Sequence, residues 1–195
     1  MILSDRDIKK AIATGRVKVD PAPDYETQLG SCSLDLRLGS DVRSFRPSKM
    51  THVDTKHMQQ AEKIMEEFVI PEGEPLVLHP GDLVLATTLE WLEISDDLIG
   101  RIEGRSSLGR LGVIVHGTAS IFDAGWKGKP VMELGNLGVV PVLLWPGMRV
   151  CAFTFEELSS PAEVPYTSKK DGKYIRQEKP LAARFSEESE NKHGR

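Results

Sequence analysis

Groups that can hold a polyanion and move a proton are crowded into residues 100–133. Arg105 and Arg110 carry planar guanidinium forks that suit phosphate oxygens, and Ser106 and Ser107 add hydroxyl donors. The glycines beside them let backbone N–H groups approach an anion closely. A Gly-Arg-Ser-Ser segment taken alone also fits a tight turn with solvated arginines. The pattern therefore indicates a phosphate site only in combination with other motifs.

Glu133 is the candidate acid/base group, because it lies in the apolar run Val131-Met-Glu-Leu134. A general base must lie within hydrogen-bond reach of the water it activates, and its surroundings must favour the required protonation state. A glutamate in a strand is more often an outward, solvated side chain. Residue type and position alone leave these two interpretations open.

Four motifs follow one another in this region: Gly104-Arg-Ser-Ser-Leu-Gly-Arg110, His116-x-Thr-Ala119, Asp123-Ala-Gly-Trp126 and Val131-Met-Glu133. Further motifs stand outside it: Met1-Ile-Leu-Ser-Asp-Arg-Asp7, Ser31-Cys-Ser-Leu-Asp-Leu-Arg-Leu-Gly39, Trp145-Pro-Gly-Met148, Pro165-Tyr166, Lys173-Tyr174 and Gln177. Together they resemble the dCTP deaminase family, a branch of the trimeric dUTPase superfamily. The resemblance spans nearly the whole chain, apart from residues 50–68 and about the last dozen.

The resemblance implies a hydrolase that deaminates dCTP to dUTP and ammonia in nucleotide metabolism, on the route to dUMP and dTTP. By this resemblance Glu133 is the proton shuttle, while Ser106, Arg110 and the Ala119 carbonyl hold the attacking water and the exocyclic amine. Asp123 meets the deoxyribose 3′-hydroxyl. The implied substrate-binding set is Arg105, Ser106, Ser107, Leu108, Gly109, Arg110, Asp123, Val131, Met132, Glu133, Tyr166, Lys173 and Gln177.

Two further residues keep open roles. His116 fits a structural or loop-ordering histidine better than a catalytic one, since a lone histidine has many satisfied structural roles. Trp126 either supports the sugar or packs locally.

The sequence argues against zinc. Zinc deaminases use an H-x-E and P-C-x-x-C signature, and neither occurs here. We expect magnesium on the triphosphate, with no dedicated metal site in the protein. The resemblance also implies a homotrimer and feedback inhibition by dTTP through the loop 116–119.

Alternative functions remain at this stage. Ile121 stands where dUTP-forming bacterial relatives carry arginine, and residues 123–128 look closer to dUMP-forming relatives. Ala152 instead replaces a glutamine frequent in the dUMP-forming group, and the spacing from Tyr166 to Gln177 matches dUTP-forming enzymes. Simple deamination is favoured, with a bifunctional, dUMP-forming deaminase/dUTPase as the runner-up. A plain dUTPase or a silent nucleotide-sensing module would be further possibilities.

Composition restricts location and partners. The 195 residues carry a formal net charge of −4, so extended nucleic-acid binding is not expected, and a small anion is the better partner. Neither an export signal nor a long apolar run is present, which predicts a cytoplasmic protein without membrane contact. Cys32 and Cys151 are expected to be buried free thiols.

The elements that must position these groups are mostly strands. Residues 5–14 predict a short helix capped by Ser4 and closed by Gly15, and a strand begins at Cys32 with alternating apolar side chains. Residues 55–67 have helical spacing, although an ordered loop fits equally well.

Pro-Gly turns at Pro80 and Pro146 separate further apolar runs, which indicates an all-β sandwich, jelly roll or barrel. The resemblance specifies the distorted β-barrel of the dUTPase type. We expect one domain over residues 1–195, with about 160–195 forming a mobile lid and tail.

Overall fold

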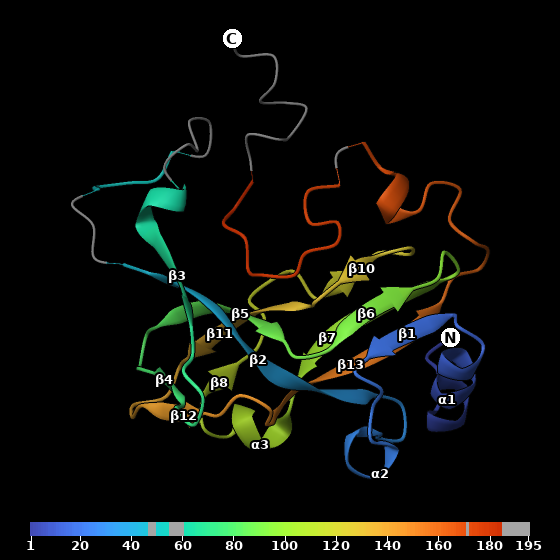
Figure 1. The fold of residues 1–195 in the computed structure, drawn as a ribbon, viewed down its shortest axis with the longest axis horizontal. Helices are drawn as coiled ribbons and strands as arrows, with labels where there is room; N and C mark the ends of the chain where they lie inside the picture. Colours follow the sequence, from blue (N-terminus) through green and yellow to red (C-terminus); the bar gives the residue numbers. More distant parts are fainter. Residues whose placement is uncertain (47–49, 55–60, 171, 185–195) are drawn as a thin grey trace.

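One curled antiparallel sheet runs through the computed structural model, which describes residues 1–46, 50–54, 61–170 and 172–184 (Figure 1). In spatial order its strands are β8 (Val113–Ile114), β11 (Val131–Asn136), β5 (Leu83–Thr88), β2 (Leu34–Phe45), β13 (Arg149–Glu157), β7 (Leu98–Gly104) and β9 (Ile121–Phe122). β3 (Met65–Val69) pairs with the second half of β2. The long β2 therefore connects both halves of the sheet.

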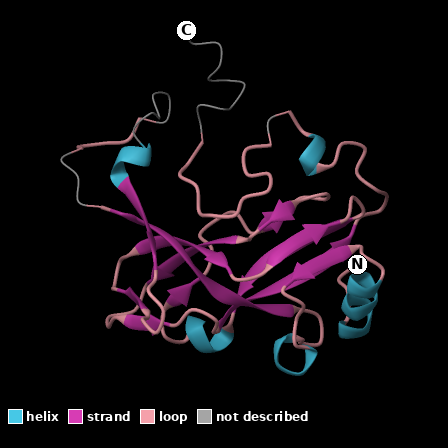
Figure 2. Cartoon of the chain, in the orientation of Figure 1, coloured by secondary structure: helices cyan, strands magenta, loops and turns pink. Residues whose placement is uncertain are grey.

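Two small sheets complete the β structure: β1 (Val17–Asp20), β6 (Trp91–Ile94) and β10 (Lys127–Gly128) form one, and β4 (Leu76–Leu78) with β12 (Val142–Leu144) forms the other. Helices are short and peripheral (Figure 2): α1 (Asp5–Ala13), α2 (Tyr25–Gln28), α3 (Ser106–Gly109) and the 3₁₀ turns η1 (Ala61–Ile64) and η2 (Tyr166–Ser168). None of the helices in the described ranges is long and apolar enough to cross a membrane. The predicted all-β class with a short N-terminal helix is confirmed.

The N-terminal helix follows its capping signals. The Ser4 hydroxyl accepts a hydrogen bond from the Asp7 backbone N–H at 3.4 Å, and Gly15 ends the helix with a φ of +76°. Ile8 and Ala11 are buried against the sheet.

The alternation predicted after Cys32 is confirmed from Leu34 onward, since Leu34, Leu36 and Leu38 are all fully buried. Cys32 itself lies in the turn before β2 and is exposed, so the expectation that it is buried in a strand was wrong. Cys151, on β13, is the buried thiol, and both cysteines are free. Burial raises the pKa of the Cys151 thiol, which keeps it protonated and inert.

For residues 55–67, where the sequence left a helix and an ordered loop open, neither alternative holds throughout. Residues 55–60 lie outside the described residues, residues 61–64 form the 3₁₀ turn η1, and 65–67 already belong to β3. The helix was wrong for 65–67 because Met65 pairs with Phe45 of β2, and this tertiary pairing outweighs local spacing. The Pro-Gly turns are confirmed, with positive φ at Gly81 and Gly147.

The core is closely packed where β7 pairs with β13. Phe153 and Phe155 are fully buried, and their rings lie 5.3 Å apart. Gly100 of β7 faces them, and a Cβ at this position would stand 2.2 Å from Cε1 of Phe153. The absence of a side chain at Gly100 is therefore a packing requirement.

We predict that Gly100→Ala destabilises the protein by about 1–3 kcal/mol, because the added methyl group must displace a buried aromatic ring. Gly104→Ala is the matched control on the same strand, since its Cβ would meet only Val115 at 3.9 Å. Chemical denaturation of both variants measures the difference. Equal stabilities would contradict the packing argument.

Candidate active site

A cavity of about 430 Å³ opens between the curled sheet and the C-terminal segment. Six of the predicted site residues line it: Ala119, Asp123, Val131, Glu133, Tyr166 and Gln177. They come from β11, from the loops around β9, and from the chain after β13. The fold thus gathers segments that lie up to 58 residues apart in the sequence, from Ala119 to Gln177, around one concave surface.

Glu133 sits in the middle of β11, where it pairs with Leu85 of β5 and donates its backbone N–H to the Val115 carbonyl at 2.9 Å. Its Oε2 atom accepts hydrogen bonds from the Gly117 N–H at 2.6 Å and the Thr118 N–H at 3.4 Å. Because both donors point at Oε2, a proton on this carboxyl group belongs on Oε1. The loop therefore determines which oxygen can exchange a proton.

Asp123 stands at the mouth of the cavity, and its Oδ2 atom contacts Nζ of Lys169 at 3.0 Å. The same ammonium lies 5.8 Å from the centre of the Tyr166 ring. Both members of the ion pair are nearly half exposed, so water and ligand groups can compete for them. Trp126 is buried, lines the cavity and packs edge-on against Phe122 at 4.7 Å, so it does pack locally, while support of the sugar stays a prediction.

The C-terminal segment is attached to the sheet by backbone hydrogen bonds. The Arg176 N–H donates to the Lys127 carbonyl, and the Lys129 N–H donates to the Gln177 carbonyl at 2.8 Å. Lys179 then binds Glu67 of β3 at 2.8 Å. This hydrogen bond lowers the pKa of the Glu67 carboxyl group, against the effect of burial, with further help from Arg43. Residues 172–184 thus form a strap across the cavity, while the predicted tail beyond 184 lies outside the described residues.

The predicted phosphate segment lies elsewhere. α3, which Arg110 follows directly, occupies the opposite side of the molecule from the C-terminal segment, at the lower edge of Figure 1. The turn after α3 meets the end of β11, where the Leu137 N–H donates to the Gly112 carbonyl at 2.8 Å. Leu137 is four residues beyond Glu133, which is about 13 Å along a strand. Ser106, Ser107 and Arg110 are exposed and do not line the cavity of their own chain.

Several other predicted residues have distinct environments. The side chains of Leu108 and Met132 are buried in the core, so only their backbone atoms face outward. Lys173 is not among the cavity residues, although its carbonyl accepts from Arg184 at 3.0 Å. His116 lines the cavity with Nε2 3.9 Å from Glu103, and its buried Nδ1 has no hydrogen-bond partner in the described parts of the chain.

Sequence reasoning missed the apolar wall of the cavity, which is formed by Phe45, Met65, Leu85 and Leu181. Phe45 and Met65 face each other across β2 and β3, but strand alternation alone cannot distinguish a cavity wall from core. Leu181 comes from the strap, whose path depends on tertiary hydrogen bonds. We find no local signal that would have identified these four residues.

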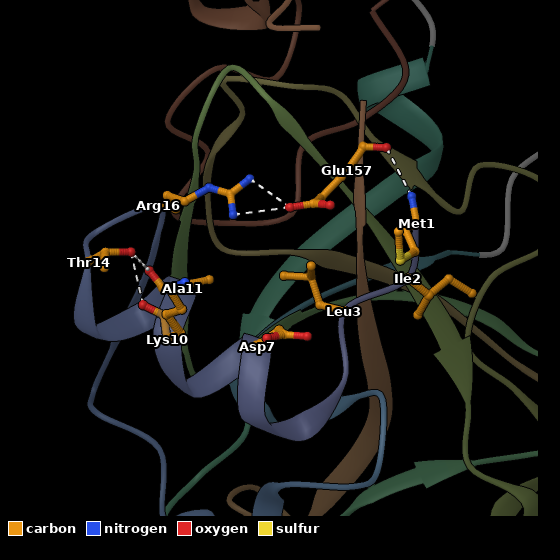
Figure 3. Close-up of a pocket in the computed structure, with 9 residues that line it drawn as sticks. All are labelled: Met1, Ile2, Leu3, Asp7, Lys10, Ala11, Thr14, Arg16 and Glu157. Atoms are coloured by element: carbon orange, nitrogen blue, oxygen red, sulfur yellow. Dashed lines mark hydrogen bonds and ion pairs between the residues drawn. The ribbon is translucent and has the colours of Figure 1, made fainter. Parts of the chain in front are cut away.

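A second cavity, of about 470 Å³, lies beside α1 (Figure 3). Its polar groups already bind one another: Arg16 contacts Glu157, the Met1 amine donates to the Glu157 carbonyl, and the Thr14 hydroxyl donates to helix carbonyls. Although this cavity is slightly larger, none of the predicted catalytic or binding residues lines it. The Glu133 cavity is therefore the candidate active site.

Comparison with known proteins gives consistent matches. The model of the dCTP deaminase-like family matches residues 2–158. The dCTP deaminase of Thermomicrobium roseum is 52% identical over 96% of this chain and 95% of its own. The dUMP-forming dCTP deaminase of Dictyoglomus thermophilum is 46% identical over 95% of both chains.

Among solved structures, the 2′-deoxycytidine 5′-triphosphate deaminase of Agrobacterium tumefaciens is similar in fold, with a TM-score of 0.62 and 24% identity. The match covers 80% of this chain and 48% of that longer chain.

The polar cluster beside the second cavity gives a pH prediction. Burial disfavours the charged form of Asp97, but hydrogen bonds from Ser95 and from Arg16, at 2.6 Å, outweigh it and lower the pKa of the Asp97 carboxyl group. Its stabilising effect is therefore complete above the unfolded-state pKa of about 3.9 and is lost as the pH falls through the lower folded-state value. We expect Asp97→Asn to reduce the melting temperature at pH 7 and to have a shrinking effect below about pH 4.

The exposed neighbour Asp96→Asn is the control, measured by the same thermal scans. A difference between Asp97→Asn and the parent that stays constant from pH 7 to pH 2 would contradict this assignment.

Proposed function

The chain belongs to the dCTP deaminase-like family, and on this premise we propose that it hydrolyses dCTP to dUTP and ammonia in pyrimidine deoxynucleotide synthesis. The observation that carries the proposal is Glu133, whose carboxylate faces a nucleotide-sized cavity with Oε2 held by two loop N–H groups. Oε1 is left to exchange protons with a water molecule. Carboxylate acid/base catalysis needs this arrangement.

In the proposed reaction, Glu133 takes a proton from water as the water oxygen bonds to C4 of cytosine, and it returns that proton to ring N3. A second transfer through Oε1 moves the proton of the new C4 hydroxyl group to the exocyclic amine. The C4–N bond then breaks, ammonia leaves, and the C4 carbonyl of uracil forms. The Ala119 carbonyl lines the same cavity and is assigned to orient the water.

The remaining site residues hold the substrate. We assign Asp123 to the 3′-hydroxyl, Val131 and the Met132 backbone to the base, and Tyr166, Lys173 and Gln177 to the lid. Arg105, Ser106, Ser107, Arg110 and the backbone of Leu108 and Gly109 are assigned to phosphates, water and amine. Magnesium is expected to arrive on the triphosphate oxygens, the ligands this hard cation prefers. The described residues contain no group of three or more His, Cys, Asp or Glu side chains suited to a metal ion.

We infer that the enzyme is a homotrimer with shared active sites. The separation between Glu133 and the α3 segment supports this, because Glu133 lines the cavity whereas none of residues 105–110 does. A head-to-tail contact that closes into a ring would bring α3 of one subunit to the cavity of its neighbour. Feedback inhibition by dTTP and a cytoplasmic location, expected from the sequence, remain predictions.

A second product has specific support. The similar proteins from Dictyoglomus thermophilum and Methanobrevibacter smithii are named dUMP-forming. Ile121 and Asp123 line the cavity, where the sequence departs from the dUTP-forming pattern. Release of dUMP and pyrophosphate from dCTP is therefore the alternative reaction.

The first test is turnover of dCTP, with magnesium in excess over a chelator that removes transition metals, and with products separated by ion-exchange chromatography. We expect dUTP and ammonia, whereas direct dUMP and pyrophosphate would establish the alternative. Glu133→Gln should reduce the rate by at least about 10²-fold, since it removes the acid/base group and keeps the side-chain shape. Glu66→Gln, an exposed carboxylate on β3, is the control.

If a folded, dCTP-binding Glu133→Gln protein kept its rate within a few-fold, the role of Glu133 would be refuted. Binding of dCTP by the parent protein without any product would favour the sensing module.

The shared site predicts complementation between two inactive variants. Co-expressed Glu133→Gln and Arg110→Gln subunits form mixed trimers in which one of the three sites is intact, so equal mixing should restore about a quarter of the parent activity. Mixing the two purified variants without subunit exchange is the control. No recovery in verified mixed trimers would mean that both residues act within one chain.

A further inference from the structure

Asp35 of β2 lies outside the cavity, yet it contacts the first residue of the predicted phosphate segment. Its Oδ2 atom is 3.0 Å from Nε of Arg105 and 3.3 Å from Nη1 of Arg149. The Asp35 and Arg105 side chains are 17% and 26% exposed, which reduces competition from water. This pair is therefore more ordered than the open ion pairs of the surface.

Arg105 is held by a second contact at another nitrogen of its guanidinium group. Its Nη1 atom donates to the Arg149 carbonyl at 2.9 Å. The register of β13 against β2 shifts between Arg149 and Cys151, which marks a bulge there. The bulge releases the Arg149 carbonyl from regular pairing and makes it available to Arg105.

The two contacts hold the guanidinium group at two of its three nitrogens and so fix its plane. Nε and Nη1 are used, whereas Nη2 makes no hydrogen bond to any residue in the described ranges. Arg105 is also the residue immediately before α3, next to the exposed hydroxyl groups of Ser106 and Ser107. A planar guanidinium group held at two nitrogens presents the N–H groups of the third, Nη2, in fixed directions.

We propose that Asp35 is a positioning residue that orients Arg105 toward the triphosphate of the substrate. The inference rests on the proposed function, because it takes Arg105 as a phosphate ligand. Asp35 does not touch the substrate itself. It acts by removing the rotational freedom of Arg105 before the nucleotide arrives, and preorganisation of this kind strengthens binding.

This role is distinguishable from a simple charge effect. Asp35 is an anion beside a predicted anion site, so charge alone predicts that Asp35→Asn binds triphosphate more tightly. Positioning predicts weaker binding, because the amide holds the guanidinium group less firmly. The two explanations differ in the sign of the change.

The experiment uses the full chain and two measurements: steady-state turnover of dCTP, and calorimetric binding of inorganic tripolyphosphate with magnesium. For Asp35→Asn we expect KM and the tripolyphosphate Kd to rise about ten-fold, with kcat within about two-fold of the parent. Glu93→Gln is the matched control, since Glu93 also contacts two cations, Lys18 and Lys127, on the other sheet. Melting temperatures verify that each variant is folded.

Arg105→Lys provides the second variant. A lysine keeps the charge and can still contact Asp35, but it cannot present an outward fork, so Kd should rise by a similar factor. Adding Asp35→Asn to Arg105→Lys should then change little, because the two substitutions remove the same interaction. If Asp35→Asn does not fold, an unchanged Kd for Arg105→Lys refutes the proposal.

Unchanged or tighter tripolyphosphate binding by folded Asp35→Asn, or additive effects in the double variant, would overturn the positioning role. Failure of the parent protein to bind tripolyphosphate would overturn it as well. If the parent binds tripolyphosphate but forms no uracil nucleotide, deamination is refuted, and the Kd comparison still decides the role of Asp35.

Discussion

The buried carboxylate of Glu90 connects the elements on which the site is built. It is fully inaccessible to solvent and accepts hydrogen bonds from Gln28 Nε2 at 3.0 Å and from Arg37 N and Nε at 2.8 and 2.6 Å. Gln28 also donates to the Asp35 carbonyl at 2.9 Å. A buried charge without its partners is strongly destabilising, so this network fixes α2 and the turn at Glu90 onto β2. The same network holds the Asp35 backbone through Gln28. It thereby also fixes the position of the Asp35 carboxylate that contacts Arg105.

The position of α3 relative to β11 determines the quaternary requirement of the proposed enzyme. β11 places Glu133 at the cavity, while its far end carries the turn that follows α3. A rigid strand cannot bring these two ends together, which is why we propose that the acid/base group and the basic segment of one chain serve different sites. In the proposed trimer, Glu133 of one subunit and the α3 segment of its neighbour form one site. A single chain would then have only half of each site, so activity would require assembly.

The sequence predicted the features that depend on local chemistry. The cap at Ser4, the alternation from Leu34 and the Pro-Gly turns were readable because turn, cap and strand preferences act over a few residues. Cys32 and residues 65–67 were misassigned, because a turn and a cross-strand partner override local pattern there. Motif resemblance pointed to Glu133, which does line the cavity, and its role stays a prediction. The apolar wall and the Asp35 contact depend on pairings between distant segments, which no local pattern encodes.

The candidate site contains two contacts that can remain in place during the reaction, at Glu133 and Arg105. It also contains one exposed ion pair, between Lys169 and Asp123, that substrate binding would break. Oε2 of Glu133 is held by backbone N–H groups of the loop after β8, and Arg105 is held by a half-buried carboxylate. Both contacts reduce the reorganisation required when substrate binds. The Lys169 to Asp123 ion pair is different, because its exposed members gain little from each other in water. In the proposed reaction the sugar hydroxyl group assigned to Asp123 therefore replaces Lys169 at small cost, and Lys169 precedes the strap by three residues.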